Sequence, residues 1–138
     1  DSNVLDVASE GIYKADRIRD ISEERRKQFF HRGRGSMTGN VRVVPELRSM
    51  VEFRKLNLLD RQWSVDSPID IIFCRNVMIY FDKPTQLKIL ERMVGLMSPD
   101  GLYFAGHSEN FSHATNLVKA AGKTTYRPVK TRGDNVRI

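Results

Sequence analysis

The residues best suited to chemistry follow an apolar segment, Ile69–Cys74. Arg75 and Asn76 come directly after it, and Tyr80 lies four residues beyond Asn76. Arginine offers a planar fork of donors to a carboxylate or phosphate, and asparagine offers both a donor and an acceptor. If the segment is a strand, a bound ligand would meet these side chains at its end. The alternative is that Arg75 caps a helical region and Tyr80 fills the core, and position alone does not decide between them.

Two other groups of polar residues carry weaker signals. Asn57 precedes Leu58, and a lone asparagine is more often a turn former than a ligand contact. The run His107–Glu109 has the composition of a hydrolase triad, but adjacent residues rarely converge as nucleophile, base and orienting acid. No Gly-x-Ser-x-Gly turn is present either. We therefore expect Ser108 or Asn110 to cap a helix.

Metal and phosphate-loop chemistry are not indicated. The single cysteine, Cys74, and the isolated His31 and His113 do not have the spacing of metal ligands. Neither a Gly-x-Gly-x-x-Gly motif nor a P-loop occurs. The glycines between residues 33 and 39 are better explained as positions where another backbone approaches closely.

The elements that must position these residues alternate regularly. Ile69–Cys74 is nearly all apolar, as in a strand buried on both faces of a parallel sheet. A helix is expected from Pro84 to about Met97, then a turn at Ser98–Gly101 and a strand at Gly101–Gly106. This order predicts a right-handed βαβ crossover in an open parallel sheet, with function at the carboxyl ends of its strands.

The flanking regions are less regular. Ser22 is expected to cap a helix over Glu23–Phe30, and His31–Asn40 is expected to be a loop or hairpin. The other expected elements are a helix from Asp1 or Ser2 to Glu10, strands at Val41–Val44 and Met50–Phe53, a helix at Asn116–Ala121, a strand at Thr124–Val129, and a frayed tail at 130–138. The simplest interpretation of the middle region is a small antiparallel β unit between helices, and the alternative is a plain surface loop.

Composition limits the classes of protein that fit. The 138 residues suit one domain, and 40% of them are hydrophobic, which is enough for a core. No apolar run is long enough to cross a membrane, and a single cysteine excludes an internal disulfide framework and fits a reducing cytoplasm. Lys and Arg number 23 against 17 Asp and Glu, a net charge of +6 that favours an acidic partner. Because the sequence opens on Asp1 rather than methionine, we expect a fragment of a longer protein.

Two runs, Ile71–Asp82 and Ser98–Asn110, closely resemble the chemotaxis receptor methyltransferase family, CheR. The resemblance covers roughly residues 1–129, and the Cys-Arg-Asn-Val-Met-Ile-Tyr-Phe stretch is highly specific. It implies an α/β fold with a partial doubly wound sheet, Rossmann-like, of the class I S-adenosylmethionine methyltransferases. It also implies a cytoplasmic enzyme that forms methyl esters on glutamates of the helical cytoplasmic bundle of chemoreceptors.

The resemblance also implies roles for individual residues. Asn57 and Leu58 would lie beside the adenosyl part of S-adenosylmethionine, and Arg75 and Asn76 at the cofactor pocket. Tyr80 would lie near the transferring methyl and the substrate carboxylate. Because a glutamate is already ionised near pH 7, no general base is needed, and Arg75 and Tyr80 are expected to act as catalytic, orienting donors.

The glycine-rich region matches a second feature of the family. Members that tether to a pentapeptide at the receptor carboxyl terminus carry an Arg-Gly-x-Gly-x-x-x-Gly-x-x-Arg pattern in a small β-subdomain. All the fixed positions are present here, and they are Arg32, Gly33, Gly35, Gly39 and Arg42. We expect residues 31–54 to form this inserted antiparallel β-subdomain, in which a sheet edge accepts the tail as an added strand.

The family's glycine-rich cofactor loop and its ribose-binding acid are expected to precede Asp1. We therefore predict that these 138 residues form part of a catalytic domain and, alone, neither bind cofactor strongly nor turn over. The alternative function is a non-catalytic module that docks receptor tails. Methylation of nucleic acid is disfavoured because Arg75–Met78 lacks the paired prolines of amino-methylating enzymes, and membrane insertion is not expected.

Overall fold

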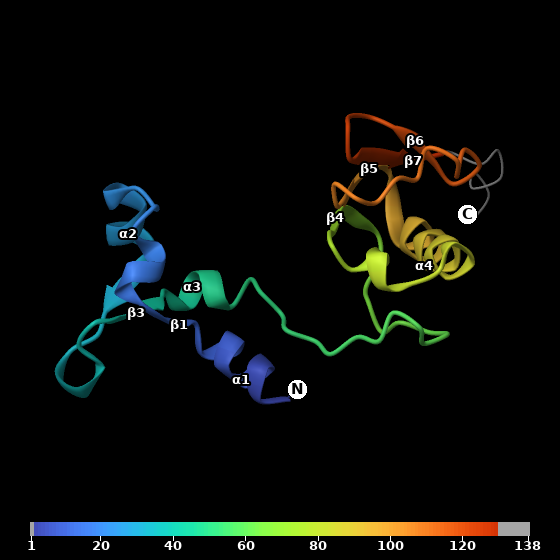
Figure 1. The fold of residues 1–138 in the computed structure, drawn as a ribbon. Helices are drawn as coiled ribbons and strands as arrows, with labels where there is room; N and C mark the ends of the chain where they lie inside the picture. The colour runs from blue at the N-terminus through green and yellow to red at the C-terminus, as the bar shows by residue number, and fades with distance from the viewer. Residues whose placement is uncertain (1, 130–138) are drawn as a thin grey trace, which may run out of the picture. The chain divides into compact units, whose positions relative to one another are not determined.

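The computed structural model describes residues 2–129, in two compact units that meet in sequence between Asn57 and Leu58. Figure 1 shows the elements of each unit. The frayed tail predicted at 130–138 lies outside the described residues. None of the described helices is long and apolar enough to span a membrane.

The first unit is built on a three-stranded antiparallel sheet in the order β1-β3-β2. Its small core includes the buried side chains of Ile18, Val41 and Val44. In chain order its elements are α1 (Ser2–Glu10), β1 (Ile12–Lys14), the 3-10 helix η1 (Ala15–Ile18), α2 (Glu23–Phe29), β2 (Phe30–Arg32), the 3-10 helix η2 (Gly35–Met37), β3 (Asn40–Val43) and α3 (Pro45–Arg48).

Local sequence signals explain where these helices begin. The Ser22 side chain accepts a hydrogen bond from the Arg25 N–H, as predicted for the cap of α2. Glu23 and Glu24 occupy the first turn of α2, where negative charge is favourable. Pro45 opens α3 directly after β3 and turns the chain away from the sheet.

The strand predicted at Met50–Phe53 is wrong. Residues 51–57 have no regular secondary structure, and Met50 and Val51 are 79% and 55% exposed. The partners of β3 come instead from β1 and β2, two three-residue strands too short to give a period-two pattern. Because α3 diverts the chain after β3, the apolar residues at 50–53 have no strand to pair with in the described part of the unit.

The second unit contains a four-stranded mixed sheet in the order β4-β5-β7-β6. Its elements are β4 (Ile69–Cys74), the 3-10 helix η3 (Met78–Tyr80), α4 (Lys83–Leu96), β5 (Met97–Ala105), β6 (Val118–Ala120) and β7 (Thr125–Pro128). The predicted β4-α4-β5 succession is confirmed, with β4 parallel to β5. The sheet is not wholly parallel, because β7 pairs antiparallel with both β5 and β6. The helix predicted at Asn116–Ala121 is wrong, since Val118–Ala120 forms β6.

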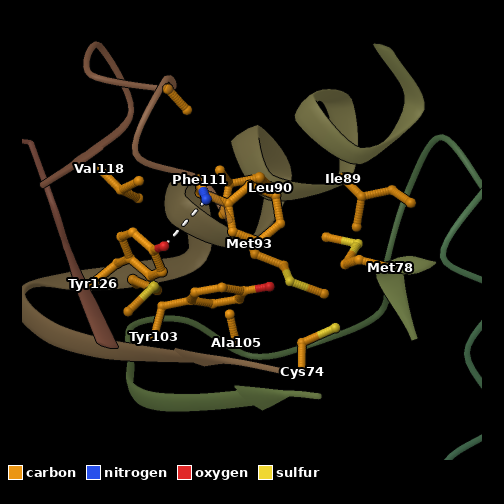
Figure 2. Close-up of a cluster of buried hydrophobic side chains, with 12 residues drawn as sticks. Cys74, Met78, Ile89, Leu90, Met93, Tyr103, Ala105, Phe111, Val118 and Tyr126 are labelled. Carbon is orange, nitrogen blue, oxygen red and sulfur yellow. Dashed lines mark hydrogen bonds between the residues drawn. The ribbon is translucent and has the colours of Figure 1, made fainter. Parts of the chain in front are cut away.

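Helix α4 covers one face of this sheet and builds the core with it (Figure 2). Asp82 caps the helix by accepting a hydrogen bond from the Thr85 N–H at 2.9 Å, and this bond lowers the pKa of the Asp82 carboxyl. The largest fully buried side chains of the core are Tyr103, Phe111, Met78, Ile89 and Leu90. Three aromatic rings contribute edge contacts, with the Phe111 centroid 5.9 Å from Tyr103 and 6.0 Å from Tyr126.

The residues of the turn predicted at Ser98–Gly101 lie within β5. The pairs Ile69–Met97 and Ile71–Leu102 show that β5 advances five residues while β4 advances two. The additional residues form an irregularity in the ladder. Gly101 is required there because a Cβ atom would lie 2.9 Å from the Asp70 carbonyl oxygen.

Burial of β4 on both faces, expected from its apolar sequence, is not found. Cys74 faces α4 and is buried, whereas Ile71 and Phe73 on the other face are 53% and 69% exposed. Phe73 stacks on Phe104 of β5 with ring centroids 4.6 Å apart. The described residues of the second unit therefore cover one apolar face of the β4–β5 pair and leave the other exposed.

Replacing either of two buried tyrosines in this core by phenylalanine is expected to have opposite effects on stability. The Tyr103 hydroxyl has only the weakly hydrogen-bonding Cys74 thiol beside it and no nitrogen or oxygen partner among the described residues, whereas the Tyr126 hydroxyl accepts from the Phe111 N–H at 3.1 Å (Figure 2). We expect Tyr103→Phe to raise the free energy of unfolding by about 1 kcal/mol, because it removes a desolvated polar group. Tyr126→Phe leaves a buried N–H unpaired and should cost about 1–3 kcal/mol. Urea titrations of the two variants measure both, and equal effects would contradict the prediction.

Candidate functional site

The carboxyl ends of β4 and β5 are held in close contact. The connection between β4 and η3 is the short segment 75–77, in which Asn76 has a positive φ of 60°. A Cβ atom at Gly106, directly after β5, would lie 2.7 Å from the Asn76 Oδ1 atom and 2.9 Å from its backbone nitrogen. Glycine at 106 therefore allows the loop after β4 to lie directly against the end of β5.

The predicted ligand-facing side chains are exposed at this edge of the sheet. Arg75 and Asn76 are exposed, and Tyr80 in η3 is 80% exposed. The Arg75 guanidinium makes no hydrogen bond or ion pair with the described residues. Tyr80 is therefore not part of the core formed by the described residues of this unit. The structure thus places Arg75, Asn76 and Tyr80 on one short segment with their side chains available to a ligand.

Sequence reasoning missed Glu109, which organises this edge. Its side chain is only 4% exposed, and its carboxylate accepts from the N–H groups of Val77, Met78 and Gly106 at 3.1, 2.8 and 2.6 Å. In the sequence Glu109 is visible only as the third residue of the His107–Glu109 run. A glycine at the end of a predicted strand, followed three residues later by a carboxylate, was the available signal.

The remaining residues of that run have local roles. His107 and Ser108 are exposed, so no triad is assembled. Asn110 does not cap a helix as expected, because no helix follows it within residues 111–129; its side chain accepts from the Ser112 N–H at 2.8 Å and closes a turn.

The core thiol beside this loop is not suited to nucleophilic chemistry. Burial raises the pKa of the Cys74 thiol, with Glu109 acting in the same direction. Burial also raises the pKa of the Tyr103 hydroxyl, and the neighbouring Cys74 adds to the effect. Both groups are therefore neutral near pH 7, and they contribute packing. The described residues contain no cluster of His, Cys, Asp and Glu that would hold a metal.

Asn57 and Leu58 belong to different units. Asn57 is exposed and ends the first unit, whereas Leu58 opens the second and packs against its core. The Leu58 carbonyl accepts from the Arg92 guanidinium at 3.4 Å, and the Asp60 carbonyl accepts from the same nitrogen atom. Leu58 is thereby tied to α4 of the second unit.

Glycine is required at three positions of the hairpin for different structural reasons. A Cβ atom at Gly33 would lie 2.1 Å from the Met37 carbonyl oxygen, so the loop closes against Gly33 itself. Gly35 and Gly39 have φ values of 58° and 84°, a region that other residues rarely adopt. The close approach expected from a bound peptide is therefore made, at Gly33, by the hairpin's own backbone.

Beside the hairpin lies a groove of about 790 Å³ within the first unit. Its lining includes the cations Arg26, Lys27 and Arg32 and one acid, Glu23, which pairs with Lys27 at 2.6 Å. In sheet order β2 is an edge strand, so its outer side has no strand partner in the described part of the unit. A basic groove beside an open strand edge suits an extended, acidic peptide.

The two arginines of the motif do not face the same way. In the β2–β3 register, Arg42 lies opposite His31, and Arg32 lies opposite Val41. Because side chains alternate along a strand, Arg32 and Arg42 lie on opposite faces of the sheet. Arg32 lines the groove, whereas the Arg42 Nε atom donates to the Glu10 carbonyl at 3.0 Å.

Comparison with known proteins agrees with this arrangement. Residues 1–127 match the family described as CheR methyltransferase, SAM binding domain. Chemotaxis protein methyltransferase 2 of Pseudomonas aeruginosa is 56% identical over 128 residues, which cover 93% of this chain and 46% of that protein. The chemotaxis protein methyltransferases of Escherichia coli and Salmonella typhimurium are 49% and 50% identical over 126 residues, each covering 91% of this chain and 44% of the relative. The chain spans about half the length of these relatives, and it belongs to the CheR methyltransferase family.

Proposed function

We propose that this chain forms part of an S-adenosylmethionine-dependent methyltransferase that converts glutamate side chains of bacterial chemoreceptors to methyl esters. One observation carries the proposal: Arg75, Asn76 and Tyr80 are exposed together on a fixed loop at the carboxyl ends of β4 and β5. In an open α/β sheet this is the edge at which ligands bind. On this proposal the second unit is one side of a doubly wound, Rossmann-like sheet, and the first unit contains an inserted β-subdomain.

The residues at this edge fit the polar part of the cofactor. The Arg75 guanidinium offers a donor fork to a carboxylate and has no partner among the described residues. Asn76 beside it offers an amide donor and acceptor. Asn57 and Leu58, at the junction between the units, are proposed to contact the adenosyl part. When bound, the cofactor supplies a methyl group already activated by its sulfonium.

The protein's task is then alignment. The attacking glutamate carboxylate is ionised near pH 7, so no side chain has to remove a proton. Arg75 and Tyr80 are proposed to orient this carboxylate and to exclude water from the line of attack. A tight ion pair with Arg75 would also stabilise the ground state, so orientation by hydrogen bonds is favoured over strong pairing.

The first unit is proposed to capture the receptor. Its groove is lined by Arg26, Lys27 and Arg32 together with Glu23, and the edge strand β2 contributes Phe30 and Arg32 to it. This chemistry suits the acidic carboxyl-terminal pentapeptide of a chemoreceptor, whose cytoplasmic helical bundle carries the target glutamates. Tethering raises the local concentration of those glutamates without changing the chemical step. The proposal therefore places the protein in the cytoplasm.

The test uses a full-length chimera. The 128 aligned residues of the Pseudomonas aeruginosa relative are replaced by those of this chain, and transfer of labelled methyl to receptor membranes is measured. Base-labile label on receptor is the expected result, since methyl esters hydrolyse in alkali. A folded chimera that transfers no methyl would exclude the proposed function.

A second function, receptor docking without catalysis, is favoured by the division into two units. The groove lies within the first unit and needs no residue of the second. For the 138-residue chain alone we expect no micromolar binding of S-adenosylhomocysteine, because the described residues contain no glycine-rich cofactor loop. Calorimetry tests this, and a dissociation constant in the micromolar range would show that the chain holds the cofactor unaided.

A further inference from the structure

Two buried polar side chains serve the same exposed segment. Among the described residues, the charged or amide side chains that are buried are Gln86 and Glu109, at 7% and 4% exposure. Both direct their polar atoms to the backbone of residues 77–81. That segment follows Asn76 and includes Tyr80, which places it within the proposed site.

Glu109 fixes the beginning of the segment. One carboxylate oxygen accepts from the Val77 and Met78 N–H groups at 3.1 and 2.8 Å. The other oxygen accepts from the Gly106 N–H at 2.6 Å. A single side chain thus joins the loop after β4 to the end of β5.

Gln86 fixes the end of the segment. From the first turns of α4, its amide nitrogen donates to the Met78 and Phe81 carbonyls at 2.8 and 2.9 Å. The 3-10 helix η3 is therefore held at its N–H groups by one buried side chain and at its carbonyl groups by another.

This arrangement is costly unless the backbone position matters. A buried carboxylate needs several donors to offset its lost hydration, and an apolar side chain at this position would leave the N–H groups of Val77, Met78 and Gly106 without this acceptor. The side chains of Arg75, Asn76 and Tyr80, which this backbone carries, are exposed, and none of them belongs to the core. What Glu109 and Gln86 hold in place is therefore the geometry of the exposed groups.

We infer that Glu109, assisted by Gln86, is a positioning residue for methyl transfer: its carboxylate sets the backbone that carries Arg75, Asn76 and Tyr80. The inference rests on the proposed function of these three residues. Glu109 does not itself touch cofactor or substrate.

The test compares four variants of the chimera. Glu109→Ala removes all three acceptor contacts, whereas Glu109→Gln keeps one oxygen for Val77 and Met78 but presents an N–H₂ group to the Gly106 N–H. Gln86→Leu removes the second clamp without touching Glu109. The control is Val118→Ala, which weakens the same core from β6. Val118 is 3% exposed and forms no hydrogen bond with residues 77–81.

Displacement of reacting groups by about 1 Å costs about 10²-fold in rate. We expect Glu109→Ala to lower kcat by about this factor, and to weaken binding of S-adenosylhomocysteine, while the KM for receptor stays unchanged. Glu109→Gln should be intermediate, and Gln86→Leu should lower kcat as well. Val118→Ala should leave kcat and cofactor affinity per folded molecule unchanged, even where its melting temperature falls as far as that of Glu109→Ala.

Equal kcat values for Glu109→Ala and Val118→Ala, at equal folded fraction, would overturn the inference. If Glu109→Ala does not fold, Glu109→Gln and Gln86→Leu give the same comparison. Amide hydrogen exchange in the 138-residue chain separates this result from failure of the proposed function. There Glu109→Gln should speed exchange at Gly106, whose acceptor it removes, even if the wild-type chimera transfers no methyl, and unchanged exchange at Gly106 would also overturn the inference.

Discussion

Replacing Arg75 by alanine is expected to lower methyl transfer by the chimera about 10²-fold, the size of effect produced by loss of an orienting group. The Arg75 guanidinium is exposed at the end of β4 and has no partner among the described residues of its unit. Its removal should therefore leave the free energy of unfolding within about 0.5 kcal/mol of wild type. Labelled-methyl transfer at saturating receptor measures the loss, and Tyr80→Phe, which removes one hydroxyl from an 80% exposed side chain, tests the second orienting group.

A matched control removes the same charge elsewhere. Lys119 is exposed on β6, which lies at the opposite edge of the sheet from β4. Lys119→Ala lowers the net charge by one unit and should leave methyl transfer unchanged. If both substitutions reduced the rate equally, the effect of Arg75 would come from general attraction of an acidic substrate, and its assignment as an orienting group would be wrong.

The alternation of β4, α4 and β5 could be read from the sequence because each element carries its own signal. Pro84 marks the start of α4, and an apolar run marks β4. The exposed loop followed from position alone, since a polar run after such a strand must leave the sheet. The exposure of one face of β4 could not be predicted. Apolar residues such as Ile71 and Phe73 indicate a buried face, but they do not show whether the described residues contain the element that would cover it.

The parts that escaped prediction depend on long-range pairing. Strands β1 and β2 have three residues each, and β6 at Val118–Ala120 has too few to be told from a short helix. Glu109 was missed for a related reason: its hydrogen-bond partners Val77 and Met78 lie 32 and 31 residues away in the sequence. A single sequence shows the carboxylate but not the backbone donors that the fold brings to it.

The second large effect is expected at Gly33. An alanine there would place its Cβ atom 2.1 Å from the Met37 carbonyl oxygen and 2.8 Å from the Met37 carbonyl carbon. Because both atoms are backbone, the hairpin between β2 and β3 has to open. Since Arg32 precedes Gly33 and both line the groove, we expect Gly33→Ala to weaken binding of a receptor-tail peptide at least about 10-fold, a loss of about 1.4 kcal/mol. Fluorescence anisotropy of a labelled peptide on the 138-residue chain measures it.

Two comparisons show whether the groove itself is responsible. Gly95→Ala adds a methyl group in α4, where nothing lies within 4 Å, and should leave peptide binding unchanged. Arg32→Ala should weaken binding more than Arg42→Ala, because Arg32 lines the groove while Arg42 lies on the opposite face and donates to the Glu10 carbonyl. Equal losses for the two arginines would favour a peptide that adds at a strand edge and contacts both faces. Unchanged binding in Gly33→Ala would place the tail outside this groove altogether.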